Sequence, residues 1–391
     1  MIKQIQRFMF KTMVYYGAGS TELIGGEAAK LGISKAMIVT DRGVRQAGLI
    51  KGVEDSLSKS GIKYDIFDEI QEDPDVNVIH KAALRIKEAG CNGVVVVGGG
   101  SPLCAGKGAA VEVTNNVRDT RELEGWNRAK VAPLPVICLP TTAGSGSDIA
   151  GGFPIVDYEN KRHFGISGEN IAPPVCILDP LLLKTCPRLP MIYAGVDALS
   201  HALEAFWGAN ANPLTDSLAY EAIRLIMTNL KEAALTDNIE AKMNQHIGST
   251  LAMLTGGQAG LGIVHAIGGV HFAFKGGSHG YKCGVVLPHV MEYHLPACEH
   301  KFGKAAAILG APAHNRTTPE LTRLFVRQVK QLLIDLDFPR KFAPENLSKA
   351  HIPEVLKEIR RNPTEIYNIT KVKDEDLARI CEASLKDWEL Q

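Results

Sequence analysis

The sequence of 391 residues has no excess of charge of either sign. Lysine and arginine together number 43, aspartate and glutamate also number 43, and the formal net charge is zero. Proteins that bind nucleic acid usually carry a basic surplus, and an acidic surplus is typical of a solvated tail. The balance therefore favours a small molecule, and not a nucleic acid, as the partner.

Long apolar runs and paired cysteines are also lacking. No apolar stretch approaches the roughly 20 residues that span a bilayer. The first twenty residues contain no sustained apolar segment followed by a cleavage signal, so they do not resemble a secretory peptide. The eight cysteines are scattered without a C-x-x-C pair, a pattern that predicts individually buried thiols in a reducing compartment. We expect a cytoplasmic protein that does not enter a membrane.

The first half of the chain alternates β-branched runs with helical patterns. Strands are predicted at 35–41, 62–70, 93–98, 132–140 and 175–183, and helices near 45–60 and at 76–90. Such alternation predicts a parallel sheet with helices on both faces. Beyond the last of these strands long helical patterns dominate. We place a domain boundary near 185, which gives an α/β domain at 1–185 and an all-helical domain at 186–391.

Glycine-rich or polar segments follow three of the predicted strands, where ligands of open parallel sheets collect. The "GGGS" segment, Gly98 to Ser101, allows backbone amides to approach a pyrophosphate, although a plain tight turn fits as well. The "TTAGSGSD" segment at 141–148 adds hydroxyl groups. Asp41 at the end of its strand is placed either to bind an adenosine ribose or to cap a helix. No G-x-G-x-x-G follows a strand, so the ordinary Rossmann fingerprint is absent.

A set of metal-ligand side chains lies in the second half. Asp197 and His201 are four residues apart in "GVDALSHALEAFWG" and would share one face of a helix. His265 and His279 follow in an apolar, glycine-rich segment. One carboxylate and three imidazoles suit a divalent first-row metal. Burying so many titratable groups without a cation would be costly.

Six segments together resemble the iron-containing (group III) alcohol dehydrogenase family. They are "GVDALSHALEAF", "GLGIVHAIGG", "GGSHG", "VVLPHVMEY", "GGGSP" with Lys107 after it, and "PTTAGSGSD". The resemblance implies a dehydroquinate synthase-like architecture, in which a Rossmann-like nucleotide domain precedes a helical metal domain and the active site lies in the cleft between them. The metal ligands that it implies are Asp197, His201, His265 and His279. The implied nucleotide contacts are Gly99, Gly100, Ser101, Thr141, Thr142 and Ser145, with Asp41 favouring NAD over NADP.

Three positions depart from the family pattern. Cys104 stands where many members carry an aspartate, Gly269 where many carry a second histidine, and His163 where a lysine is usual. With the ligand set intact, we interpret these changes as a rebuilt substrate pocket and not as loss of catalysis. His271 would replace the missing histidine as proton relay if the Gly268–Gly269 pair ends the helix; otherwise it is structural.

The resemblance implies reversible hydride transfer between NAD(P) and an alcohol, aldehyde or ketone, with the metal polarising the substrate oxygen. It implies Fe²⁺, although the ligand types accept Zn²⁺ as well, and a homodimer or larger homo-oligomer. Two alternatives stay open. One is a zinc polyol enzyme similar to glycerol dehydrogenase, and the other is a nucleotide-binding relative with weakened catalysis. A metal hydrolase would leave the nucleotide loops unexplained.

Overall fold

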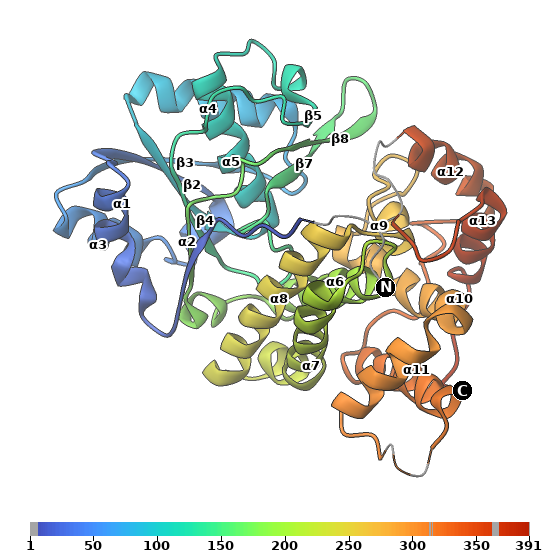
Figure 1. Cartoon of the computed structure of the whole chain (residues 1–391). Helices are drawn as coiled ribbons and strands as arrows, with labels where there is room; N and C mark the ends of the chain where they lie inside the picture. The colour runs from blue at the N-terminus through green and yellow to red at the C-terminus, as the bar shows by residue number, and fades with distance from the viewer. Residues whose placement is uncertain (1–6, 313, 315, 362–366, 391) are drawn as a thin grey trace. The chain divides into compact units, whose positions relative to one another are not determined.

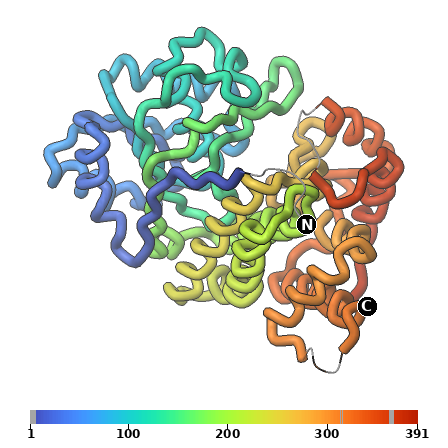
Figure 2. The backbone as a smooth tube through the Cα atoms, viewed as in Figure 1, coloured from blue at the N-terminus to red at the C-terminus, as the bar shows by residue number. Residues whose placement is uncertain are grey.

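The computed structural model describes residues 7–312, 314, 316–361 and 367–390, and the chain divides into two compact units. One unit is Phe10–Pro187, and the other combines the described part of Arg188–Gln391 with residues 7–9. Figure 1 labels their helices and strands, and Figure 2 traces the backbone, coloured by residue number. Each unit has its own core and is described by itself.

The first unit is built on a six-stranded sheet in which every neighbouring pair of strands is parallel. The strand order is β1-β9-β6-β4-β2-β3. The bounds are β1 Met13–Tyr16, β2 Lys35–Asp41, β3 Lys63–Ile70, β4 Gly93–Gly98, β6 Val136–Pro140 and β9 Val175–Leu178. The sequence analysis predicts all of these strands except β1.

Helices cover both faces of this sheet (Figure 1). In β4, Val94 and Val96 pack with α4 (Val76–Ala89) and α5 (Gly100–Asn115). The alternate residues Val95 and Val97 belong to a second cluster with α1 (Ile24–Lys30) and α3 (Lys51–Lys59). Because both faces are buried, the strands are continuous apolar runs instead of alternating apolar and polar residues.

Two local features differ from the sequence-based expectation. Two helices, α2 (Arg42–Gln46) and α3, replace the single helix predicted near 45–60. They are separated at Gly48, whose φ of 73° is not helical, so the first helix ends before it. A small second sheet of β5 (Gly125–Trp126), β8 (Arg162–Ser167) and β7 (Gly152–Asp157) is also present, in the order β5-β8-β7. Its strands are short and interrupted by glycine, so the apolar pattern that marks the main strands is weak here.

In the described part of the second unit, the regular elements are helices. Its helices are α6 Arg188–Trp207, α7 Pro213–Leu235, α8 Ile239–Ala259, α9 Ile263–Gly268, α10 His279–Ile308, α11 Thr318–Asp335, α12 Ile352–Arg361 and α13 Asp374–Ala383. Side chains from each of these helices join one apolar core, in which Trp207 and Phe302 are fully buried. Among the described residues no helix has both the length and the apolar character that crossing a membrane requires. The predicted fold class, a parallel α/β domain followed by a helical domain, is confirmed.

Candidate functional site

The glycine-rich segment after β4 and the hydroxyl-rich segment after β6 lie against each other, because the two strands are neighbours. The backbone N–H of Thr141 donates to the Gly98 carbonyl at 3.0 Å. A Cβ atom at Gly99 would lie 3.4 Å from Thr142 Oγ1, and one at Gly100 would lie 3.2 Å from Ser145 Cβ. The structure thus brings the predicted nucleotide residues of these two segments together at one edge of the sheet.

Helix α5 begins directly in this glycine segment. Its N-cap, Gly99, has no side chain to accept from the first-turn amides. Ser101 Oγ accepts from the backbone N–H of Asp73 at 3.2 Å. An uncapped N-terminus of a 16-residue helix beside a glycine turn has the donors and the dipole that bind a phosphate group. Lys107 lies further along α5, where its Nζ donates to the carbonyls of Ala150 and Gly152, and burial lowers its pKa.

Asp41 ends β2, the strand at which the strand order switches sides: β3 lies on one side of β2 and the next strand, β4, on the other. Such a switch point is where open α/β sheets bind nucleotides. The Oδ1 atom of Asp41 accepts from the backbone N–H of Val44 at 2.9 Å and so caps α2. Of the two roles that the sequence indicates for Asp41, helix capping is therefore observed, and it uses one of the two carboxylate oxygens.

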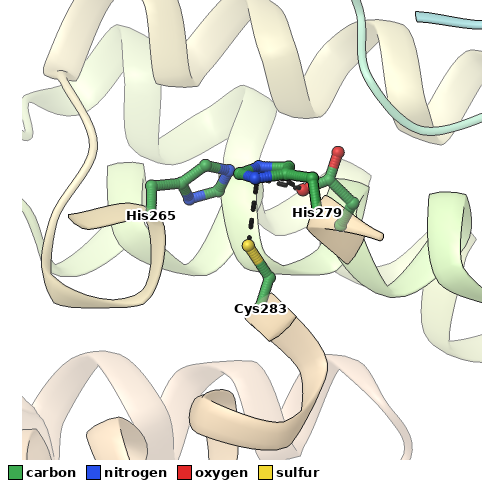
Figure 3. Close-up of side chains that lie close together, drawn as sticks. His265, His279 and Cys283 are labelled. Atoms are coloured by element: carbon green, nitrogen blue, oxygen red, sulfur yellow. Dashed lines mark hydrogen bonds and ion pairs between the residues drawn. The ribbon is translucent and has the colours of Figure 1, made fainter. Parts of the chain in front are cut away.

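The metal-ligand candidates converge within the helical unit. Asp197 lies on α6, His265 on α9, and His279 is the first residue of α10. The Oδ1 atom of Asp197 lies 3.4 Å from Nε2 of His265 and 3.4 Å from Nε2 of His279. Ligand atoms of these three residues and of Cys283 all lie within 4.8 Å of one another. Figure 3 shows His265, His279 and Cys283 pointing toward a common point.

Hydrogen bonds fix which ring nitrogen of each histidine faces this point. His265 Nδ1 lies 2.6 Å from Oε2 of Glu204. The same carboxylate accepts from the backbone N–H of Val264 through Oε1 and from that of His265 through Oε2. His279 Nδ1 donates to the Gly268 carbonyl at 3.1 Å. In both rings Nε2 is left for the cluster, as in metal sites where an outer partner orients the ligating imidazole.

The electrostatics of the cluster match the site of a cation. Burial raises the pKa of Asp197, but the neighbouring His201, His279 and His265 together outweigh this effect, so that the pKa lies well below its usual range. Burial lowers the pKa of His265, whereas Asp197 and Glu204 raise it to a net value of about 9. Among the described residues, Asp197 Oδ1 and His265 Nε2 are buried without a hydrogen bond. A buried carboxylate oxygen and a buried imidazole nitrogen that lack hydrogen bonds to the described residues are suited to binding a divalent metal, so the donor set fits the predicted ion.

The observed cluster and the ligand set predicted from the sequence share Asp197, His265 and His279. His201 lies alongside, its ring stacked on that of His265 at a centroid distance of 4.3 Å. The fourth ligand atom of the observed cluster belongs to Cys283, which the sequence analysis does not single out. Glu204 was also given no role. Its signal was its place three residues after His201, on the same buried helix face.

The remaining predicted residues lie as follows. Helix α9 ends at Gly268, with Gly269 as its C-cap. The glycine pair therefore ends the helix before His271, as the predicted proton-relay role of His271 requires. Glu358 accepts from the backbone N–H groups of His271, Phe272 and Ala273, which fixes this turn. Cys104 is buried and its Sγ lies 3.4 Å from Ser147 Oγ.

His163 stands in β8, paired in register with Val156 of β7. All eight cysteines are free, and all but Cys186 are buried, largely as the scattered pattern predicts.

A parallel sheet with a nucleotide-type switch point, followed by a helical unit with a buried metal-type cluster, defines a metal-dependent class of nucleotide-linked enzymes. Comparison with known proteins gives the family. The family model described as iron-containing alcohol dehydrogenase matches residues 11–180, and that of the family's C-terminal domain matches residues 191–385. The chain belongs to the iron-containing alcohol dehydrogenase family.

Individual relatives agree with this membership. The chain is 31% identical over 377 residues to a 1,3-propanediol dehydrogenase of Klebsiella pneumoniae, covering 95% of this chain and 97% of the relative. It is 29% identical to an NAD-dependent methanol dehydrogenase of Bacillus methanolicus, with 94% and 97% covered. The solved structure of an alcohol dehydrogenase from Oenococcus oeni is 27% identical, with a TM-score of 0.92 and coverage of 97% and 100%. The predictions of the family and of an alcohol dehydrogenase are confirmed.

Proposed function

We propose that this chain catalyses reversible hydride transfer between NAD and a small alcohol or its aldehyde or ketone, with a divalent metal held by Asp197, His201, His265 and His279. The observation that carries the proposal is the convergence of one carboxylate and two imidazole Nε2 atoms on one buried point. Lewis-acid polarisation of the substrate oxygen is what the metal supplies when bound, and nicotinamide supplies the hydride. Iron is the metal of the family, and Zn²⁺ fits the same donors.

The chain's own residues position these partners. Glu204 and the Gly268 carbonyl hold the two imidazole rings, so that no ring rotation is needed when the site is filled. Asp197 and His265 have side chains only 7% exposed, whereas the side chain of His279 is 39% exposed. A site with one accessible edge fits substrate entry on the His279 side.

For the nucleotide, the support comes from the strand-end segments. The uncapped N-terminus of α5 with Gly98, Gly99, Gly100 and Ser101 provides amide donors for a pyrophosphate. Thr141, Thr142 and Ser145 add hydroxyl groups from the neighbouring segment. The second carboxylate oxygen of Asp41, at the switch point, favours a ribose hydroxyl over a 2′-phosphate, hence NAD over NADP.

His271 is proposed as the proton relay that replaces the histidine missing at Gly269. Helix α9 ends before it, and three hydrogen bonds to Glu358 hold its backbone segment in place. An imidazole can both accept and donate a proton, so it is suited to exchange a proton with solvent. We also propose that the enzyme is cytoplasmic, in keeping with its eight free thiols, and that it forms a homodimer or larger homo-oligomer, as the family resemblance implies.

The test is anaerobic purification, elemental analysis, and an NADH-oxidation screen across aldehydes and ketones of varied size and charge. We expect about one iron or zinc per chain and turnover of at least one carbonyl. Asp197→Ala should lose both the metal and turnover, while NADH binding, followed by fluorescence, stays within about twofold because the nucleotide residues lie in the other unit. Undiminished turnover in metal-free Asp197→Ala would overturn the proposal.

A further inference from the structure

We propose that Cys283 is an additional metal ligand of this site, so that a thiolate joins the carboxylate and the imidazoles. The inference rests on the proposed function and makes its donor set more specific. Neither the spacing of the histidines nor the family resemblance assigned this residue a role. The assignment comes from where four side chains from three helices meet.

The distances between the donor atoms carry the assignment. Cys283 Sγ lies 3.5 Å from His279 Nε2, and Asp197 Oδ1 lies 3.4 Å from each of the two imidazole Nε2 atoms. Donor atoms bound to one ion at about 2.0–2.3 Å, at angles from about 90° to tetrahedral, are roughly 2.8–3.7 Å apart. The distance from Cys283 Sγ to His279 Nε2 is thus the distance expected between two ligand atoms of one metal ion.

The local fold places the thiol there. Cys283 is four residues after His279, so the two side chains share one face of the first turns of α10. Gly268, the last residue of α9, provides the space, because a Cβ atom there would lie 2.3 Å from Cys283 Sγ. The glycine pair that follows His265 therefore has a second consequence besides ending the helix: it admits sulfur to the site.

A purely structural role accounts poorly for this thiol. Besides His279 and Asp197, which belong to the cluster, it contacts the Val264 carbonyl at 4.0 Å, the outer limit of a sulfur hydrogen bond. Cys283 is fully buried, and next to it lie Asp197 Oδ1 and His265 Nε2, two buried atoms that make no hydrogen bond with any residue in the described part of the chain. On metal binding the Sγ–H bond breaks, the proton leaves to solvent, and the sulfur lone pair forms the bond to the ion. A soft thiolate added to oxygen and nitrogen donors favours Zn²⁺ or Co²⁺ over harder ions.

Cobalt(II) gives a direct readout that does not depend on turnover. The metal-free full-length protein is titrated anaerobically with Co²⁺, and its near-ultraviolet absorption is recorded for a sulfur-to-cobalt charge-transfer band. We expect the band to saturate at one cobalt per chain and to be lost in Cys283→Ser. Cys298→Ser, a buried cysteine further along the same helix, is the matched control and should keep it.

Zinc affinity then separates a ligand from a residue that only orients His279. Loss of an outer partner typically lowers metal affinity by about 10- to 100-fold, so we expect Cys283→Ser to lower Zn²⁺ affinity by more than about 100-fold in competition with a chelator. Gly268→Ala, which displaces the sulfur without removing it, should weaken the cobalt band.

Two outcomes would overturn the inference. If cobalt binds at one per chain without the band, or with a band that Cys283→Ser keeps, the thiol is not a ligand, while the proposed dehydrogenase stands. If the wild-type protein binds no cobalt, zinc or iron, both the thiol ligand and the proposed metal-dependent function are wrong.

Discussion

At the scale of single residues, His265 shows how the site is prepared before any ligand arrives. One ring nitrogen is engaged by Glu204 at 2.6 Å, and the other lies 3.4 Å from Asp197. The two carboxylates have different surroundings. Glu204 accepts three hydrogen bonds, whereas Asp197 Oδ1 makes none with any residue that the structure describes. The first therefore acts as a positioning residue, and the second is available to a cation.

Glu204→Gln tests this division. The substitution keeps the side-chain volume. However, the amide N–H group of Gln would face the backbone N–H groups and the imidazole that donate to the Glu204 carboxylate. We expect metal affinity to fall by about 10- to 100-fold and the free energy of unfolding of the metal-free protein to fall by about 1–3 kcal/mol. Zinc competition titration and urea unfolding measure the two effects.

Glu221→Gln provides the comparison for Glu204→Gln. Glu221 is a partly exposed carboxylate on α7 that pairs with Arg224, and its change should leave zinc affinity within about twofold. Equal zinc affinity in Glu204→Gln and wild type would show that Glu204 does not orient His265.

At the scale of elements, the start of α2 combines a structural and a proposed recognition role in one side chain. Asp41 caps this five-residue helix through one oxygen. Asp41→Ser keeps a capping oxygen but removes the charge, whereas Asp41→Ala removes both. We expect Asp41→Ser to narrow the preference for NAD over NADP by at least about tenfold, because the repulsion of a 2′-phosphate is lost.

Asp41→Ala should narrow the NAD preference equally and also destabilise the protein by about 1 kcal/mol through the lost cap. Ratios of kcat/KM for the two cofactors, together with thermal unfolding, separate the effects. An unchanged cofactor ratio in Asp41→Ser would leave Asp41 as a cap alone.

The small sheet depends on a buried ion pair at the end of β7. Asp157 accepts two hydrogen bonds at 2.8 Å from the Arg121 guanidinium, and further ones from Asn160. The bonds from Arg121 hold the pKa of the Asp157 carboxyl well below its usual range. A lowered folded-state pKa contributes stability that is present above the unfolded value, about 3.9, and is lost as the pH falls below it.

We therefore expect Asp157→Asn to lower the free energy of unfolding by about 1.5–3 kcal/mol at pH 7. The difference from wild type should shrink as the pH is lowered from about 5 to 3. Urea unfolding across this pH range measures both. Glu159, which also pairs with Arg121 but is exposed, is the control, since Glu159→Gln should change little. A difference that does not depend on pH would argue against the ion pair as the cause.

At the scale of the whole molecule, two separate cores predict two responses to ligand removal. The apolar cluster of the helical unit contains the proposed metal site, and the two clusters of the first unit flank its sheet. A ligand that binds only the folded form stabilises the unit that holds it, by about 2.7 kcal/mol at a concentration of 100 times Kd. Chelation should therefore lower the melting temperature of the helical unit more than that of the first unit.

The tryptophans allow this to be measured. Trp207 and Trp388 are buried in the helical core, and the third, Trp126, is exposed on the small sheet. In Trp126→Phe, thermal unfolding followed by fluorescence reports the helical unit alone, and differential scanning calorimetry reports both units. A chelator that shifts neither transition would contradict a metal site in the helical core.

The sequence by itself determined much of the architecture. Apolar runs such as 93–98 predict strands buried on both faces, and the glycine and hydroxyl segments after them mark the edge where a nucleotide binds. The i, i+4 spacing of Asp197 and His201 predicts a shared helix face. These features depend on neighbours close in the chain, so local periodicity is enough to predict them. The strand β1 and the small sheet escaped prediction because pairing with distant strands, and not local pattern, stabilises them.

Only the tertiary structure decided which atoms meet. Cys283 was one scattered cysteine among eight, and Glu204 one acid on an apolar helix, until the packing of α6, α9 and α10 brought both to the imidazoles. The separation along the chain between Glu204 and His265 is 61 residues, and no periodicity spans such a distance. Convergence of this kind depends on how side chains of three helices fill one core. The sequence therefore predicted the family and most of the donor set, while the packing revealed the partner that orients His265 and the sulfur beside His279.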